Sequence, residues 1–199
     1  MANGRVITGY SMPRVAKYDE TTSKYSNLMA LARGVSVTVD AETADSNDFY
    51  ADNVLAESAT GTFSGGTVTL EVDGLKDDAR TLIQGLATPT SITVGTDSVN
   101  VMMYDDEQKA PYCGVGFVIR YMEAGVTSYV PVVLPKVLFD VDAIEAATQE
   151  EEIDWQTTEL TATIFRADDA KHTWRKIGAA QTTEAKAVAV VEKLLTSAQ

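Results

Sequence analysis

Gly34-Val-Ser-Val-Thr-Val-Asp40 and Thr67-Val-Thr-Leu-Glu-Val-Asp73 are the two stretches that decide the fold. In each, apolar residues alternate with polar ones, which is the period-two pattern of a half-buried β-strand. Between them lies a long polar segment, residues 41–66, which is rich in Asp, Asn and Ser and carries Phe49 and Tyr50. We interpret this segment as a long acidic loop that forms a surface for a large partner rather than a catalytic pocket.

Patterns on both sides of these strands predict an α+β, mainly β domain. Helical spacing predicts an internal helix over residues 76–84 that stops at Gly85, a short acidic helix at 142–149, and a C-terminal helix capped by Thr182 or Thr183. Alternation predicts strands at 99–103, 137–141 and 160–164, and a hairpin over 112–134 that turns at 123–125. We expect two packed antiparallel β-sheets, a sandwich or barrel, with two flanking helices.

The chain divides into three parts on these patterns. Residues 1–30 show no clear periodicity, so we predict an N-terminal arm or irregular lead-in that a partner orders. Residues 31–180 form the β-sandwich domain, which includes the loop at 41–66. Residues 181–199 form the C-terminal helix.

The predicted hairpin offers a candidate inter-subunit strand. Its apolar residues share one face, whereas Gly114 and Gly116 leave the other face bare for another backbone. Pro131 has no N–H to donate to a ladder, so its arm is expected at a sheet edge or a bulge. We therefore predict that Gly114, Gly116 and Pro131 meet a neighbouring subunit.

The charge of the chain excludes several classes of function. It has 29 acids and 16 bases, a formal net charge of −13, which opposes ordinary nucleic-acid binding. Two stretches hold eight acids each and no base, one between Arg33 and Lys76 and one between Lys136 and Arg166. A solvated acidic face that aids solubility is the alternative to a functional role.

The N-terminus lacks the apolar core of a signal peptide, no apolar run is long enough to span a membrane, and the chain has one cysteine. These features predict a cytoplasmic site of synthesis.

Chemistry is sparse in this sequence, so we expect no catalytic residues, cofactor or metal, and no enzyme. Cys113 and His172 are the single residues of their kinds, and a buried thiol and a surface imidazole explain them better than a nucleophile–base pair. The segment from Asp45 to Asp48 begins like a calcium loop but lacks the required glycine, and the segment from Asp140 to Asp142 fails in the same way.

Several segments, taken in order, resemble the major tail proteins of long non-contractile-tailed phages of Gram-positive bacteria. The matching pieces are Gly34–Asp40 with Phe49–Asn53, Gly65–Leu70, Ala110–Phe117, Leu134–Phe139, Gln156–Leu160 and Thr173–Arg175, within residues 5–195. Each piece could be an ordinary strand or turn, and their order and spacing carry the resemblance.

The resemblance implies a phage tail-tube fold and a homo-oligomer, in which hexameric rings stack into a hollow conduit for genome ejection. It implies a tape measure protein inside the tube, tail terminator and distal tail proteins at its ends, and double-stranded DNA that passes without specific binding. The virion tail would be made and assembled in the host bacterial cytoplasm, without a membrane. Asp45, Asp48, Tyr50 and Asp52 are then candidates for the lumen or for ring-to-ring contacts. A tube protein of a phage-tail-like bacteriocin or injection machine, or a monomeric β-sandwich binding module, remains the alternative.

Overall fold

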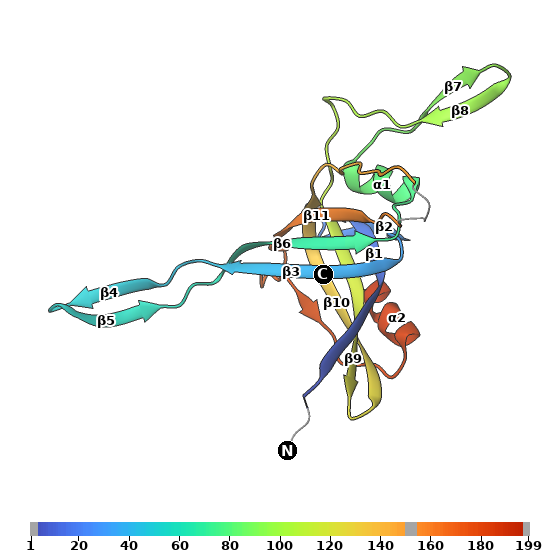
Figure 1. The fold of residues 1–199 in the computed structure, drawn as a ribbon. Coiled ribbons are helices and arrows are strands. Elements are labelled where there is room, and N and C mark those ends of the chain that lie inside the picture. The colour runs from blue at the N-terminus through green and yellow to red at the C-terminus, as the bar shows by residue number, and fades with distance from the viewer. Residues whose placement is uncertain (1–3, 150–154, 197–199) are drawn as a thin grey trace.

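A computed structural model describes residues 4–149 and 155–196 of the chain. These residues form a curved body of antiparallel β-sheet, with two helices against it and two hairpins that project from it (Figure 1). The strands of the body are β1 (Val6–Asp19), β2 (Lys24–Ala30), β3 (Gly34–Thr43), β6 (Phe63–Val72), β9 (Cys113–Glu123), β10 (Val126–Phe139), β11 (Thr158–Phe165) and β12 (Lys176–Ile177). The projecting hairpins are β4 (Asn47–Ala51) with β5 (Val54–Ala59), and β7 (Thr90–Val94) with β8 (Asp97–Val101). The helices are α1 (Asp77–Gln84) and α2 (Glu184–Leu194).

The sheet curls until its last strand returns toward its first. The strand order is β2-β1-β9-β10-β11-β6-β3, and β12 pairs with the free part of β10. β3 contacts β1, and Gly34 at the start of β3 lies against the Tyr10 ring of β1. The predicted mainly β, α+β class is therefore confirmed. The two expected sheets are two halves of one continuous eight-stranded sheet among the described residues.

Two apolar layers hold this fold together. The inner core lies inside the curl and contains the alternate residues of β6 and β9, among them Leu70 and Phe117. The outer core lies between the sheet and α2, where Val118 and Val133 meet Val191 and other residues of the helix. Each fully buried side chain of this size stabilises the fold by about 1.5–3 kcal/mol relative to its exposed state.

The predicted end of the internal helix and the predicted N-cap of the C-terminal helix are both confirmed. α1 ends at Gly85, whose φ of 64° is left-handed and whose amide donates to the Leu82 carbonyl. A Cβ at this position would lie 1.9 Å from the Lys109 carbonyl oxygen, so glycine is required. α2 begins after Thr183, whose side chain accepts a hydrogen bond from the Lys186 amide. The hairpin at 112–134 and the strand at 160–164 are confirmed as β9–β10 and β11.

The prediction of an irregular arm at residues 1–30 is wrong. β1 and β2 occupy residues 6–19 and 24–30, and β1 is an interior strand that pairs with both β2 and β9. Bulges between Ile7 and Gly9 and between Ser11 and Arg14 interrupt the alternation in β1, and Met12 has a φ of 54°. A pattern with period two is hidden when bulges shift its register. The domain predicted for 31–180 thus begins with β1.

Two further predictions are corrected. Residues 41–66 include the hairpin β4–β5 rather than a simple loop. Residues 142–149 have no regular secondary structure, although a short acidic helix was predicted there. The Asp142 side chain is held by Arg80 and Tyr104, so the start of that segment is fixed by tertiary contacts instead of helical ones. The remaining acids of that stretch at 150–152 and Asp154 lie outside the described residues.

Candidate assembly surfaces

The four candidate loop residues lie on one projecting element. We call residues 44–62, which include β4 and β5, the β4–β5 arm; it extends away from the body (Figure 1). Asp45 lies in the link before β4, Asp48 and Tyr50 lie on β4, and Asp52 lies in the turn. Asp52 and Asn53 have φ values of 50° and 62°, as a two-residue turn of the type I′ class requires. The sequence prediction therefore placed these residues together correctly but assigned their backbone wrongly.

Large apolar side chains are exposed on both faces of the β4–β5 arm. Tyr50 lies opposite Leu55 on one face, while Phe49 lies opposite Glu57 on the other. Phe49 and Tyr50 are each 62% exposed. Val54 is exposed beside the turn on the face of Phe49. Sequence reasoning noted the acids but missed this pattern. The signal was present as two short apolar pairs on either side of Asp52 and Asn53.

The root of the arm is fixed to the body. The Ala44 amide donates a hydrogen bond of 2.9 Å to the Thr62 carbonyl, and the Arg166 guanidinium donates to the Phe63 carbonyl. The Phe63 ring stacks on the Trp174 ring with 4.4 Å between centroids. These contacts define the direction in which the arm leaves the sheet, which an unsupported loop would not retain.

A second hairpin, β7–β8, projects from the body beyond α1 (Figure 1). Its two strands are joined by a turn at Gly95, whose φ is 65°. The segment that follows it is tied to α1, because Nε2 of the Gln108 side chain donates a hydrogen bond of 2.9 Å to the backbone carbonyl of Gln84. Sequence reasoning predicted only the second strand of this pair.

The predicted inter-subunit strand is not available to a neighbour, and this prediction is wrong. Gly114 and Gly116 lie in β9, an interior strand between β1 and β10. α2 covers their bare face: a Cβ at Gly116 would lie 2.4 Å from Val191 Cγ1, and one at Gly114 would lie 2.7 Å from Leu195 Cδ2. The glycines admit the chain's own helix rather than another subunit.

Pro131 is also not at a free edge. It lies in β10, which pairs with β9 on one side and with β12 next to Pro131 on the other. Its carbonyl accepts a hydrogen bond of 2.9 Å from the Gly178 amide. The missing N–H of proline is tolerated because the register of β12 does not require it.

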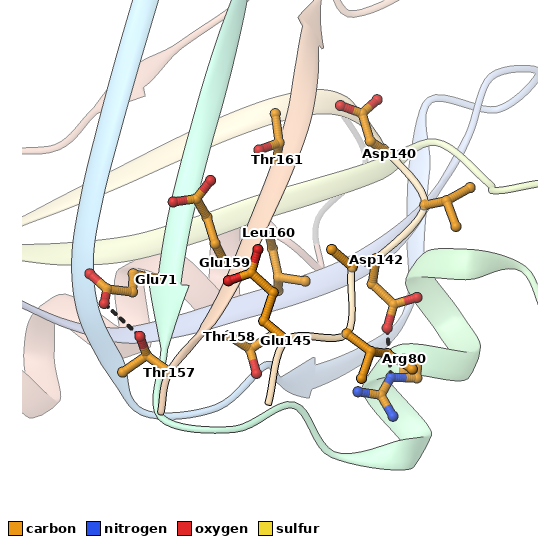
Figure 2. A pocket seen from close by; sticks show the side chains of 13 residues that line it. Glu71, Arg80, Asp140, Asp142, Glu145, Thr157, Thr158, Glu159, Leu160 and Thr161 are labelled. Atoms are coloured by element: carbon orange, nitrogen blue, oxygen red, sulfur yellow. Dashed lines mark hydrogen bonds and ion pairs between the residues drawn. The ribbon is translucent and has the colours of Figure 1, made fainter. Parts of the chain in front are cut away.

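Glu71 from the first base-free stretch and four acids from the second line one pocket of about 630 Å³, which Figure 2 shows. Glu71 of β6 and Glu159 of β11 lie directly opposite each other in the sheet. The hydrogen bonds that Glu71 accepts from Thr157 and Ser36 lower its pKa, so the carboxylate stays charged. Glu145 also lines this pocket.

Arg80 is the base that lines the acidic pocket, and it is already paired. Its Nε lies 2.9 Å from Oδ2 of Asp142, a carboxylate that is almost fully buried (Figure 2). The other oxygen of Asp142 accepts a hydrogen bond of 3.1 Å from the Tyr104 hydroxyl. This triad links α1, the segment after β8 and the end of β10, so it has a structural role.

Side chains that could perform nucleophilic or metal chemistry are not assembled in the described part of the chain. Cys113 is buried in the inner core, and burial raises the pKa of its thiol to about 12. His172 is exposed on a loop between β11 and β12. Among residues 4–149 and 155–196, no group of three His, Cys, Asp or Glu side chains is arranged to hold a metal ion.

Compared with models of known protein families and with curated proteins, the sequence shows no match. Neither helix of the described residues has the length and apolar character to cross a membrane. The inference about function therefore rests on the exposed apolar hairpins and on the distribution of charge.

Proposed function

We propose that this chain is the structural subunit of a phage tail tube, in which hexameric rings stack into a hollow conduit for genome ejection. One observation carries this proposal: the β4–β5 arm leaves the body with large apolar side chains exposed on both of its faces. A two-stranded hairpin is at best marginally stable alone in water, and scattered surface residues rarely include Phe, Tyr, Val and Leu together. Such an arm is stabilised when neighbouring copies cover both faces.

The edges of the sheet support assembly between copies of the chain. β2 and β3 are the terminal strands of the described sheet, and β3 has an outer edge that runs to Thr43 at the root of the arm. An exposed edge can pair with a strand of another chain. Contacts between two different surfaces of the same subunit give a closed ring when the rotation from one subunit to the next adds up to a full turn. Otherwise they give an open assembly that continues to grow. An arm and an edge on one subunit supply both kinds of contact.

The acidic surface suits a conduit for DNA. The chain has a net charge of −13, to which Asp45, Asp48 and Asp52 on the arm and the carboxylates around Glu71 contribute. A ring of several copies carries a multiple of this charge. Basic walls would bind phosphates and release counterions, whereas acidic walls repel them within about 8 Å at physiological salt. DNA would therefore pass without specific binding. A tape measure protein inside the tube, and terminator and distal tail proteins at its ends, complete the proposal, in which the chain has no catalytic role.

Substitution on the arm tests this proposal. Phe49→Ser removes an exposed ring from the apolar surface, and we expect weaker assembly in sedimentation velocity, with an unchanged melting temperature. Glu57→Gln is the matched control, because Glu57 is the cross-strand neighbour of Phe49 and the change keeps it polar. If wild-type protein stays monomeric at all accessible concentrations, the tube proposal is wrong and a monomeric binding module is favoured.

A further inference from the structure

The β7–β8 hairpin has one polar face and one apolar face. Ser91, Thr93, Ser98 and Asn100 alternate onto the polar face. Ile92 and Val94 of β7 and Val99 of β8 lie on the opposite face and are 47%, 59% and 44% exposed. A hairpin that is exposed to solvent on both faces is not stabilised by placing its apolar residues on one face. Apolar residues stabilise a face only when another surface covers it.

The apolar face also carries one charge. Asp97 pairs with Val94 beside the turn, so its carboxylate lies on the same face as Ile92 and Val99. A partner surface for this hairpin should therefore combine exposed aliphatic side chains with a base.

Such a surface lies at the other end of the body. A pocket of about 460 Å³ is lined by Arg5, Glu123, Ala124, Val126, Ser128 and Ala180. Val126 and Ile7 beside it are 69% and 62% exposed. The Arg5 guanidinium lies 4.6 Å from the centroid of the Tyr121 ring, which presents its charge next to these aliphatic side chains.

The two surfaces are too far apart to meet within one chain. α1, which precedes the β7–β8 hairpin, lies beside Lys17 and Pro111 at the start of β9. The Arg5 pocket lies at the end of β9, next to Glu123. A strand from Cys113 to Glu123 spans about 30 Å at about 3.3 Å per residue. Figure 1 shows the β7–β8 hairpin and the β9–β10 turn at opposite ends of the molecule.

We propose that the apolar face of the β7–β8 hairpin docks into the Arg5 pocket of a second copy of the chain. Ile92, Val94 and Val99 then cover Ile7 and Val126, and Asp97 pairs with Arg5. Because the two surfaces differ and lie at opposite ends, the contact repeats head to tail. This inference rests on the proposed function, since it names a stacking contact of the same assembly, but it concerns a hairpin that the tube proposal does not require.

Charge reversal tests the contact directly. Arg5→Glu and Asp97→Lys should each raise the concentration at which tubes form by about tenfold, because each places like charges together. The double variant should recover most of the wild-type behaviour, since the pair is restored with opposite polarity. Asp106→Lys is the control, being an exposed acid near the hairpin but outside its apolar face, and should leave tube formation unchanged.

Disulfide trapping supplies an independent measurement. Cysteines at Ile92 and Val126 in one chain should give a ladder of cross-linked oligomers, whereas cysteines at Thr93 and Val126 should not, because Thr93 lies on the polar face. The native Cys113 is buried and does not interfere. If charge reversal has no effect and no ladder forms while wild-type tubes are visible, this contact is wrong and the tube proposal stands. If wild-type protein never assembles, both are wrong. Dimers from Ile92→Cys alone indicate hairpin-to-hairpin pairing and also overturn the contact.

Discussion

Gly114 and Gly116 show that glycines in a strand can be interpreted in two ways from the sequence, as a contact with another subunit or as a contact within the chain. Both glycines leave one face of a strand without side chains, and that bare face admits another piece of backbone or another helix. Periodicity places the glycines on the face opposite the apolar residues, which is correct. It does not say what fills the space, because α2 is about 70 residues away in sequence and its position depends on tertiary packing.

The first prediction concerns Gly116. Gly116→Ala should lower the free energy of unfolding by about 1–3 kcal/mol, because the new methyl group would lie 2.4 Å from Val191 Cγ1 and 3.2 Å from Val133 Cγ2. Gly65→Ala is the control, since a Cβ at Gly65 meets nothing within 4 Å. Urea denaturation measures both. Equal stabilities of the two variants would contradict the packing of α2 on β9.

The second prediction concerns the Cys113 thiol. Its pKa is raised to about 12 by burial, so the thiol stays protonated at pH 8, where a free cysteine is partly ionised. Native protein should not react with iodoacetamide at pH 8, whereas protein unfolded in urea should take up one label. Mass spectrometry measures the uptake. Rapid labelling of the native chain would place Cys113 outside the core.

At the scale of elements, alternation was a reliable guide where a strand has one buried face. β6 and β11 are predicted because each alternates without interruption, and β9 is predicted from its alternating apolar residues although α2 covers its other face. β1 was missed because two bulges break its alternation, and β4 and β5 were missed because both of their faces are exposed. Burial of one face creates the alternation, so strands that are exposed on both faces show no such pattern. The four candidate residues within 45–52 lie on one projecting element, which is a hairpin instead of the predicted loop, and their role at a lumen or between rings stays a prediction.

The third prediction concerns the triad that links α1 to the segment after β8. Asp142→Ala should destabilise the protein by about 2 kcal/mol, because it leaves the partly buried Arg80 guanidinium without its ion-pair partner and the Tyr104 hydroxyl without its acceptor. Amide exchange should increase in residues 102–112. Asp77→Ala is the control, because Asp77 is largely exposed and lies 4.0 Å from the same arginine. A similar loss of stability in both variants would contradict the structural role of the triad.

At the scale of the molecule, two hairpins with exposed apolar residues project from one well-packed body (Figure 1). The body buries most of its large apolar residues in an inner and an outer core. The hairpins differ, because their large apolar side chains are exposed in the single chain. Sequence reasoning inferred assembly from resemblance and charge, whereas the geometry adds specific surfaces for it.

Electron cryo-microscopy of the purified wild-type protein, over a series of rising concentrations, shows whether this chain builds a tube. We expect closed rings that stack into hollow tubes, with the β4–β5 arm of each copy buried between its neighbours and Phe49 in contact with another chain. Particles that remain single subunits at every concentration, or assemblies in which the arm extends into solvent, would contradict it.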